Sequence, residues 1–293
     1  MINYLKKNVL RLISSQSLEW VLLIVALLPF FLISAFNHPT DDDFHNAARG
    51  SVESFIAFQK TLYTGWTGRY TSNLLYSLVY RSSDLPSWLR LIKLAPVLWL
   101  LGIIGSTYFA MRVVLPLFNR LTALRFTLWS VLLLLYGMPL LVSALYWYCG
   151  AAVYTIGCIL SLLLLGAAGR ALRATNGPVR WAWSLMAAFF VFALLGCNEI
   201  YIGGIGMGLA LTLIFCAPHT RPVVLLWVLV MLVGGAFSIM APGNFVRAAQ
   251  EGISGGVKFS IGRLAVTICK DIYLTHAHWA AWSSNGLLWL ATI

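Results

Sequence analysis

Charge is scarce in this sequence. Only 10% of its 293 residues are charged and 60% are hydrophobic, with a mean hydropathy of +0.84. A soluble domain of this length needs far more charge to cover its surface, so the soluble globular class is excluded. Hydrophobic stretches long enough to cross a bilayer indicate an all-α polytopic membrane protein instead.

Metal-binding cysteine patterns, internal repeats and soluble linkers are also missing. The five cysteines, at positions 149, 158, 197, 216 and 269, lie mostly inside apolar runs. This placement is typical of small buried hydrophobic residues, although a disulfide between Cys149 and Cys197 stays open. Without a linker, we expect one transmembrane domain over residues 1–293.

The basic residues give a formal net charge of +11. They flank apolar spans and do not gather with aromatic residues on one polar face, so they indicate membrane topology and no nucleic-acid partner. Lys6, Lys7 and Arg11 precede the first span, whose apolar run is too long for a signal peptide. We expect a retained first helix with its N-terminus in the cytoplasm.

The apolar runs predict about seven to eight transmembrane helices. The uncharged run at 126–169 would extend about 66 Å as one helix, twice the bilayer core, so it must turn near residues 146–150. A further uncharged run, 272–293, ends without a basic anchor, which indicates that more protein follows. The expected spans are residues 21–37, 94–111, two within 126–169, two within 181–218, and 222–240.

Short connections predict the orientation. Those at 112–125, 170–180 and 219–221 carry seven basic residues and no acid, whereas those at 146–150, 198–201 and 241–251 carry one arginine and two glutamates. The first set is therefore expected in the cytoplasm and the second outside. Residues 38–93 form the first outer loop, with six basic residues and apolar positions at helical spacing, which predicts amphipathic interfacial helices.

Three consecutive aspartates, Asp41, Asp42 and Asp43, begin this outer loop and hold a third of the nine acidic residues of the chain. One of them suffices to cap the helix expected from Phe44. The others are candidates for a general base, or for ligands of a divalent cation such as Mg²⁺ or Mn²⁺, with Asp42 and Asp43 as the metal candidates.

Further candidates fall on the same expected outer face. Glu199, between apolar spans, is a functional hypothesis by default, although it can also be a wet residue of an outer turn; Asn198 beside it could orient a polyhydroxyl ligand. Arg69 lies among glycines and aromatic residues; its guanidinium suits a phosphate, and the aromatic faces suit a sugar. Arg247 follows a Pro-Gly-Asn turn. Both arginines can instead snorkel to lipid headgroups. His38, His276 and His278 could ligate a metal, but the last two have weak spacing for it.

Several of these pieces, taken in order, resemble the GT-C superfamily of integral membrane glycosyltransferases. They are more narrowly similar to the bacterial family of serotype-converting O-antigen glucosyltransferases and uncharacterised relatives. The resemblance spans roughly residues 17–250. Its pieces are Asp41-Asp42-Asp43-Phe44, Trp66-Thr67-Gly68-Arg69-Tyr70, the turn from Trp147 to Tyr154, Asn198-Glu199, and Ala241-Pro242-Gly243-Asn244 with Arg247.

The resemblance implies a transferase in the bacterial inner membrane that moves a sugar from a polyprenyl-phosphate-linked donor to a glycan or lipid acceptor at the outer face. Asp41 or Asp42 would be the base, and Asp43 ranks after them as a candidate. Arg69 and Arg247 would hold the carrier phosphate. Metal dependence stays open. The other implied substrate contacts are Trp66, Tyr70, Trp147, Tyr148, Asn198, Glu199 and Asn244.

Two other classes remain open at this point. A transporter or lipid flippase could use the aspartates and Glu199 to relay ions or protons, but the charged groups gather at one face and no inverted repeat is visible. A non-catalytic subunit of a larger assembly is the other, suggested only by the unanchored run at 272–293.

Overall fold

The computed structural model describes residues 16–80 and 85–250. Within these ranges the chain forms helices and no strand, which confirms the predicted all-α class. Residues 1–246 form one compact unit and residues 247–293 a second, of which only 247–250 are described. The prediction of a single domain over the whole chain therefore stays a prediction, and the run at 272–293 lies outside the described residues.

Among the described residues, six helical segments are long and apolar enough to cross a membrane, which confirms a multi-pass membrane protein. The segments comprise α2 (Gln16–Ile33) with the short η1 (Ser34–Phe36), α6 (Leu85–Val114), α7 (Arg120–Gly137), α8 (Tyr148–Val153) with α9 (Thr155–Arg173), α10 (Gly177–Leu195), and η3 (Pro218–Thr220) with α12 (Arg221–Ile239).

The second span predicted within residues 181–218 corresponds to α11 (Ile200–Phe215), which is apolar but only 16 residues long. It extends about 24 Å, less than the roughly 30 Å of a bilayer core. The helix α6 begins at Leu85, nine residues before the predicted span, so the last part of the expected outer loop is the start of this helix. The mixed polarity of residues 85–93 concealed that start.

The turn predicted at residues 146–150 lies earlier in the structure. The helix α7 ends at Gly137, two residues before Pro139, which lacks the N–H that a helix interior needs. A π-helical turn, η2 (Val142–Tyr146), then leads into α8. The aromatic stretch is thus the beginning of a helix, and the proline sets the turn.

Three short helices follow α2, as the amphipathic pattern of the outer loop predicts: α3 (Asp41–Gly50), α4 (Phe55–Gly65) and α5 (Tyr70–Tyr80). The side chain of Ser54 accepts a hydrogen bond from the Ala57 N–H at 3.2 Å and so caps the N-terminus of α4. The helix α4 buries Phe58 and Leu62 and leaves Ile56 exposed, which suits a helix beside lipid.

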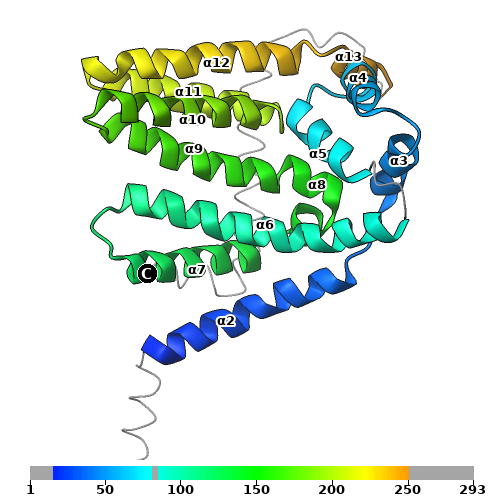
Figure 1. Ribbon diagram of the computed structural model, residues 1–293, viewed down its shortest axis with the longest axis horizontal. Helices are drawn as coiled ribbons and strands as arrows, with labels where there is room; N and C mark the ends of the chain where they lie inside the picture. The colour runs from blue at the N-terminus through cyan, green and yellow to red at the C-terminus, as the bar shows by residue number, and fades with distance from the viewer. Residues whose placement is uncertain (1–15, 81–84, 251–293) are drawn as a thin grey trace, which may run out of the picture. The chain divides into compact units, whose positions relative to one another are not determined.

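The long helices of the first unit run back and forth between two ends (Figure 1). One end, which we call the arginine end, carries Arg112, Arg120, Arg125, Arg170, Arg173, Arg180 and Arg221 near the α6–α7, α9–α10 and α11–α12 connections. The other, the α3–α5 end, carries the three short helices and the connections that follow α10 and α12.

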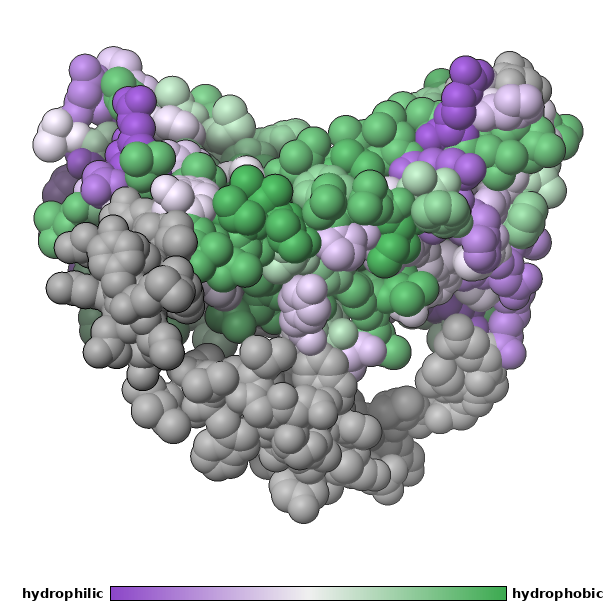
Figure 2. All heavy atoms as spheres, turned by 90° about the horizontal axis from the view of Figure 1, so that it is seen from below, coloured by the Kyte–Doolittle hydropathy of each residue, from purple (hydrophilic) through white to green (hydrophobic). Residues whose placement is uncertain are grey.

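The interior of the first unit is apolar and so is the belt around it. One core cluster joins α9, α10, α11 and α12 around Trp227, and another joins α2, α6, α7 and α9 around Leu100. Figure 2 shows a hydrophobic middle with hydrophilic residues toward both ends of the face in view. This distribution is typical of a bundle whose middle contacts lipid.

Candidate functional site

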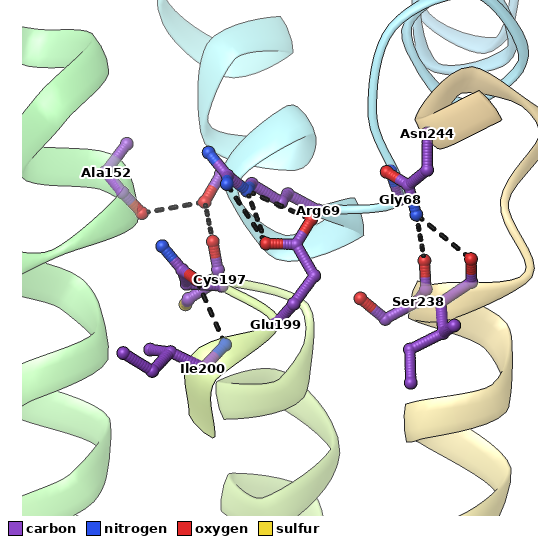
Figure 3. Close-up of polar contacts among 11 residues, drawn as sticks. Gly68, Arg69, Ala152, Cys197, Glu199, Ile200, Ser238 and Asn244 are labelled. Carbon is purple, nitrogen blue, oxygen red and sulfur yellow. Dashed lines mark hydrogen bonds and ion pairs between the residues drawn. The ribbon is translucent and has the colours of Figure 1, made fainter. Parts of the chain in front are cut away.

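Three chain segments meet at the α3–α5 end (Figure 3). They are residues 66–69 before α5, residues 196–199 before α11, and residues 238–244, which run from the end of α12 into the start of α13 (Pro242–Gln250). The backbone N–H groups of Thr71 and Ser72 donate to the Gly196 carbonyl at 2.9 and 3.3 Å. The Thr71 hydroxyl donates to the Ala193 carbonyl at 2.7 Å. These bonds attach the first turn of α5 to the last turn of α10 and use the N–H groups that an anion would otherwise find there.

Glycine makes this close approach possible. A Cβ at Gly68 would lie 2.0 Å from the Ser238 carbonyl oxygen, and one at Gly196 would lie 2.3 Å from the Tyr70 ring. Both distances are far below van der Waals contact. The segment around Gly68 is therefore part of a tightly packed junction.

Asn244, a predicted substrate contact, holds this junction together. Its Oδ1 accepts the Gly68 N–H at 3.0 Å, and its Nδ2 donates to the carbonyls of Ser238 and Ile239 at 2.7 and 3.1 Å. The side chain thus ties the 66–69 segment to the end of α12. Its role in the structure is that of a cross-link between two loops.

Arg69 and Glu199 form an ion pair across the junction (Figure 3). The Arg69 Nε lies 3.1 Å and its Nη2 3.0 Å from Glu199 Oε2, and Nε also lies 3.3 Å from Oε1. The side chains are 23% and 28% exposed, so a ligand can reach them. Two residues predicted to contact different parts of a substrate contact each other.

Asn198 also has a local role. Its Oδ1 accepts the N–H of Ile200, the first residue of α11, at 3.1 Å. Behind it, the Ser72 hydroxyl lies between the Ala152 and Cys197 carbonyls at 2.9 and 3.3 Å, which joins α5 to α8 as well. The pair of Arg69 and Glu199 is thus mounted on helices fixed on several sides.

The three aspartates begin α3 and differ in environment. Asp43 is fully buried. Its Oδ2 accepts the Thr40 N–H at 2.9 Å and the Thr40 hydroxyl at 3.3 Å, while its Oδ1 accepts the Tyr80 hydroxyl at 2.5 Å. Asp41 and Asp42 are exposed. Capping, the simplest of the sequence-based interpretations, therefore describes Asp43, and the other two carboxylates are accessible to a ligand.

The hydrogen bond of Asp43 belongs to a buried polar network. The Tyr80 hydroxyl also lies 3.2 Å from Cys149 Sγ, which accepts from Asn46 Nδ2 at 3.4 Å. The Tyr76 hydroxyl donates to the Cys149 carbonyl at 3.0 Å. Sequence reasoning missed this network because tyrosine and cysteine in apolar helices read as core, and no spacing in the chain links residues 43, 80 and 149.

Asp42 is an accessible carboxylate whose pKa is raised. Partial burial raises the pKa of Asp42 above its ordinary value; the negative charges of Asp41 and Asp43 raise it further, while His45 lowers it. A carboxylate with a raised pKa is a better general base than an ordinary aspartate. Asp42 is therefore an accessible carboxylate whose raised pKa suits a proton acceptor.

The predicted aromatic contacts divide into exposed and buried rings. Trp66 is 45% exposed beside the junction. The hydroxyls of Tyr70 and Tyr148 donate to the carbonyls of Phe192 and Leu75 at 2.5 and 3.0 Å, and both rings pack against neighbours. Trp147 is half-buried, and its indole N–H has no acceptor within the described residues. Trp66 is thus the most exposed of these four rings.

The ion pair and the aspartates lie at opposite ends of α5. Arg69 precedes this helix and Tyr80, which contacts Asp43, ends it, a separation of about 16 Å along 11 residues. Tyr76 lies within α5, between these two ends. In the part of the chain that the structure describes, no hydrogen bond or ion pair joins Arg69 to any of the three aspartates.

The structure constrains two other predictions less: the metal site, and the contact of Arg247 with the carrier phosphate. No group of three or more His, Cys, Asp or Glu side chains that could hold a metal occurs among the described residues. Both oxygens of Asp43 already accept hydrogen bonds, which leaves Asp42 as the open metal candidate. Arg247 lies in α13 and is the first residue of the second unit, so its relation to the junction is not described.

In comparisons with known proteins, the chain matches no protein-family model, no curated protein and no solved structure.

Proposed function

We propose that the protein is an inverting glycosyltransferase that takes a sugar from a polyprenyl-phosphate-linked donor and transfers it to a glycan or lipid acceptor. The observation that carries the proposal is the arrangement of the α3–α5 end. An accessible carboxylate of raised pKa, Asp42, and a partly exposed guanidinium, Arg69, lie at the same end of an apolar helix bundle. A lipid-linked phosphosugar needs both groups beside a membrane.

The chemistry assigns one role to each group. Asp42 accepts the proton of an acceptor hydroxyl as that oxygen attacks the anomeric carbon of the donor sugar. The bond between this carbon and the phosphate oxygen breaks, and its electron pair stays on the phosphate. The products are the new glycoside, with inverted configuration, and a polyprenyl phosphate. Arg69 stabilises the charge that develops on the leaving phosphate.

The separation of the two groups fits a substrate with its charge at one end. In this proposal the sugar lies between Arg69 and Asp42, along α5, which carries Tyr76 between its two ends. Trp66 is exposed beside Arg69 and offers an aromatic face to the sugar. The exposed Ile56 of α4 offers apolar surface for the polyprenyl chain at the same end.

The arginine end sets the orientation that we propose. The positive-inside rule puts its seven arginines in the cytoplasm, and therefore the α3–α5 end outside, in the inner membrane of a bacterium. The N-terminus would then be cytoplasmic, and the reaction would take place at the outer face.

Replacement of the aspartates one at a time tests the proposal. The assay measures sugar transfer by purified protein in nanodiscs from a panel of prenyl-phosphate sugars to cell-envelope acceptors. We expect Asp42→Asn to lower turnover by about 10²-fold or more, as loss of a general base does. Full turnover in folded Asp42→Asn protein would remove Asp42 from the mechanism.

The pH profile provides a second readout. The rate should fall as the pH drops through the pKa of Asp42, at a higher pH than for an ordinary aspartate, because the base must be deprotonated. Asp41→Asn removes one negative neighbour, which lowers the pKa of Asp42 and shifts this fall to lower pH. An unchanged profile in Asp41→Asn would contradict the assignment.

A further inference from the structure

The guanidinium of Arg69 uses only one of its edges in the protein. Its Nε and Nη2 nitrogens face the carboxylate of Glu199 at 3.0 to 3.3 Å. Its Nη1 makes no hydrogen bond within the described residues and belongs to a side chain that is 23% exposed. Because a guanidinium is rigid and planar, a carboxylate held against the Nε–Nη2 edge also fixes the direction of Nη1.

The carboxylate is itself held in place. Glu199 directly precedes α11, and the Asn198 side chain accepts the N–H of Ile200, the first residue of that helix. Three residues before Glu199, the Gly196 carbonyl accepts the N–H groups of Thr71 and Ser72. The two partners therefore stand on segments that are joined by backbone hydrogen bonds. This rigidity is what a pre-organised binding group requires.

We propose that Glu199 is a positioning residue for Arg69, which orients the free guanidinium edge toward the phosphate of the lipid-linked donor, and that it is not itself a sugar ligand. This inference rests on the proposed function. It changes the role that the resemblance implies for Glu199 from substrate contact to support of a phosphate ligand.

Two effects of Glu199 on phosphate affinity have opposite signs, which makes the inference testable. Its negative charge repels a phosphate, so removal of the charge alone would tighten binding. Its hydrogen bonds hold Arg69, so removal of the side chain would weaken binding if positioning dominates. The direction of the change therefore decides between the two.

The experiment measures binding of farnesyl phosphate to the full-length protein in nanodiscs, with farnesol as the probe without phosphate. We expect Glu199→Ala to weaken farnesyl phosphate binding on the order of tenfold and Glu199→Gln, which keeps an acceptor oxygen, to weaken it less. Arg69→Gln should abolish the preference for farnesyl phosphate over farnesol. The double variant should match Arg69→Gln, because the proposed effect of Glu199 on phosphate binding passes through Arg69.

A matched control separates positioning from stability. Glu19 and Arg125 form an ion pair of similar exposure, 25% and 31%, between α2 and α7 at the arginine end. Glu19→Ala should lower thermal stability as Glu199→Ala does, and leave farnesyl phosphate affinity unchanged. If Glu19→Ala weakened binding equally, the effect at Glu199 would be one of stability alone and the inference would fail.

The remaining outcomes separate this inference from the proposed function. Unchanged or tighter binding in Glu199→Ala, with binding still dependent on Arg69, would overturn the positioning role and leave the transferase proposal intact. A preference for farnesyl phosphate that survives Arg69→Gln would overturn the role of the pair. A wild-type protein that does not distinguish farnesyl phosphate from farnesol would overturn the transferase proposal itself.

Discussion

At the scale of the residue, neighbouring aspartates of one helical turn differ in burial and in hydrogen bonding. Asp43 is buried and accepts hydrogen bonds from Thr40 and Tyr80, whereas Asp42 is exposed and has a raised pKa. The negative charge of Asp43 contributes to that raised pKa. The buried carboxylate of Asp43 thus forms the capping box of α3 with Thr40, and its charge raises the pKa of Asp42.

The bond between Tyr80 and Asp43 should contribute strongly to stability. Burial raises the pKa of the Tyr80 phenol, and the nearby Cys149 and Asp43 raise it further, so Tyr80 stays protonated and donates. Tyr80→Phe leaves a buried carboxylate oxygen without its donor and should cost about 2 kcal/mol. Thermal unfolding in detergent measures the loss.

Tyr136→Phe is the matched control for this prediction. Tyr136 is 48% exposed and its hydroxyl donates to the Ala26 carbonyl at a long 3.4 Å. We expect this variant to unfold at nearly the wild-type temperature. Equal losses in the two variants would show that the hydrogen bond to Asp43 contributes nothing particular.

Sequence reasoning located several of these residues but not their partners. The concentration of aspartates and the glutamate between apolar spans were visible because charge is rare in the chain. The pairing of Arg69 with Glu199, 130 residues later, depends on how α5 packs against α10. No local pattern encodes that packing.

At the scale of the element, the helices were more predictable than the junctions between them. Apolar runs predicted the long helices, and helical spacing predicted α3 to α5. The predictions for the start of α6 and for the turn after α7 were wrong. Polar residues lie in the first turns of α6, and Pro139 places the end of α7 before the predicted turn. Close packing of glycine against backbone cannot be read from sequence at all.

That packing predicts a contrast between two nearby glycines. Gly68→Ala would place a methyl group 2.0 Å from the Ser238 carbonyl oxygen, so the α5 and α12 segments must separate. We expect a loss of about 2 kcal/mol or more in stability, together with weaker farnesyl phosphate binding because Arg69 is the next residue. Thermal unfolding and the binding assay measure the two effects.

Gly65, three residues earlier, provides the control. It ends α4, is exposed, and has open space where a Cβ would lie. Gly65→Ala should be neutral or slightly stabilising, because alanine reduces the freedom of the unfolded chain. A loss in Gly65→Ala as large as that in Gly68→Ala would contradict the packed-junction interpretation.

At the scale of the whole molecule, charge is distributed unequally between the two ends of the first unit. Within the described residues, the arginine end has seven arginines and one carboxylate, Glu19, which pairs with Arg125. The α3–α5 end of this unit has five cations and five carboxylates. For a bundle with this asymmetry, the positive-inside rule predicts that the arginine end faces the cytoplasm.

Single cysteines at exposed positions test this orientation. Ser51 lies between α3 and α4, and Leu117, which is 96% exposed, lies between α6 and α7. A membrane-impermeant maleimide should label Ser51→Cys in intact cells and Leu117→Cys only after the membrane is opened, each above the background of the unsubstituted protein. The reverse pattern would place Asp42 and Arg69 in the cytoplasm, where the polyprenyl-phosphate donor would have to be used on the inner face.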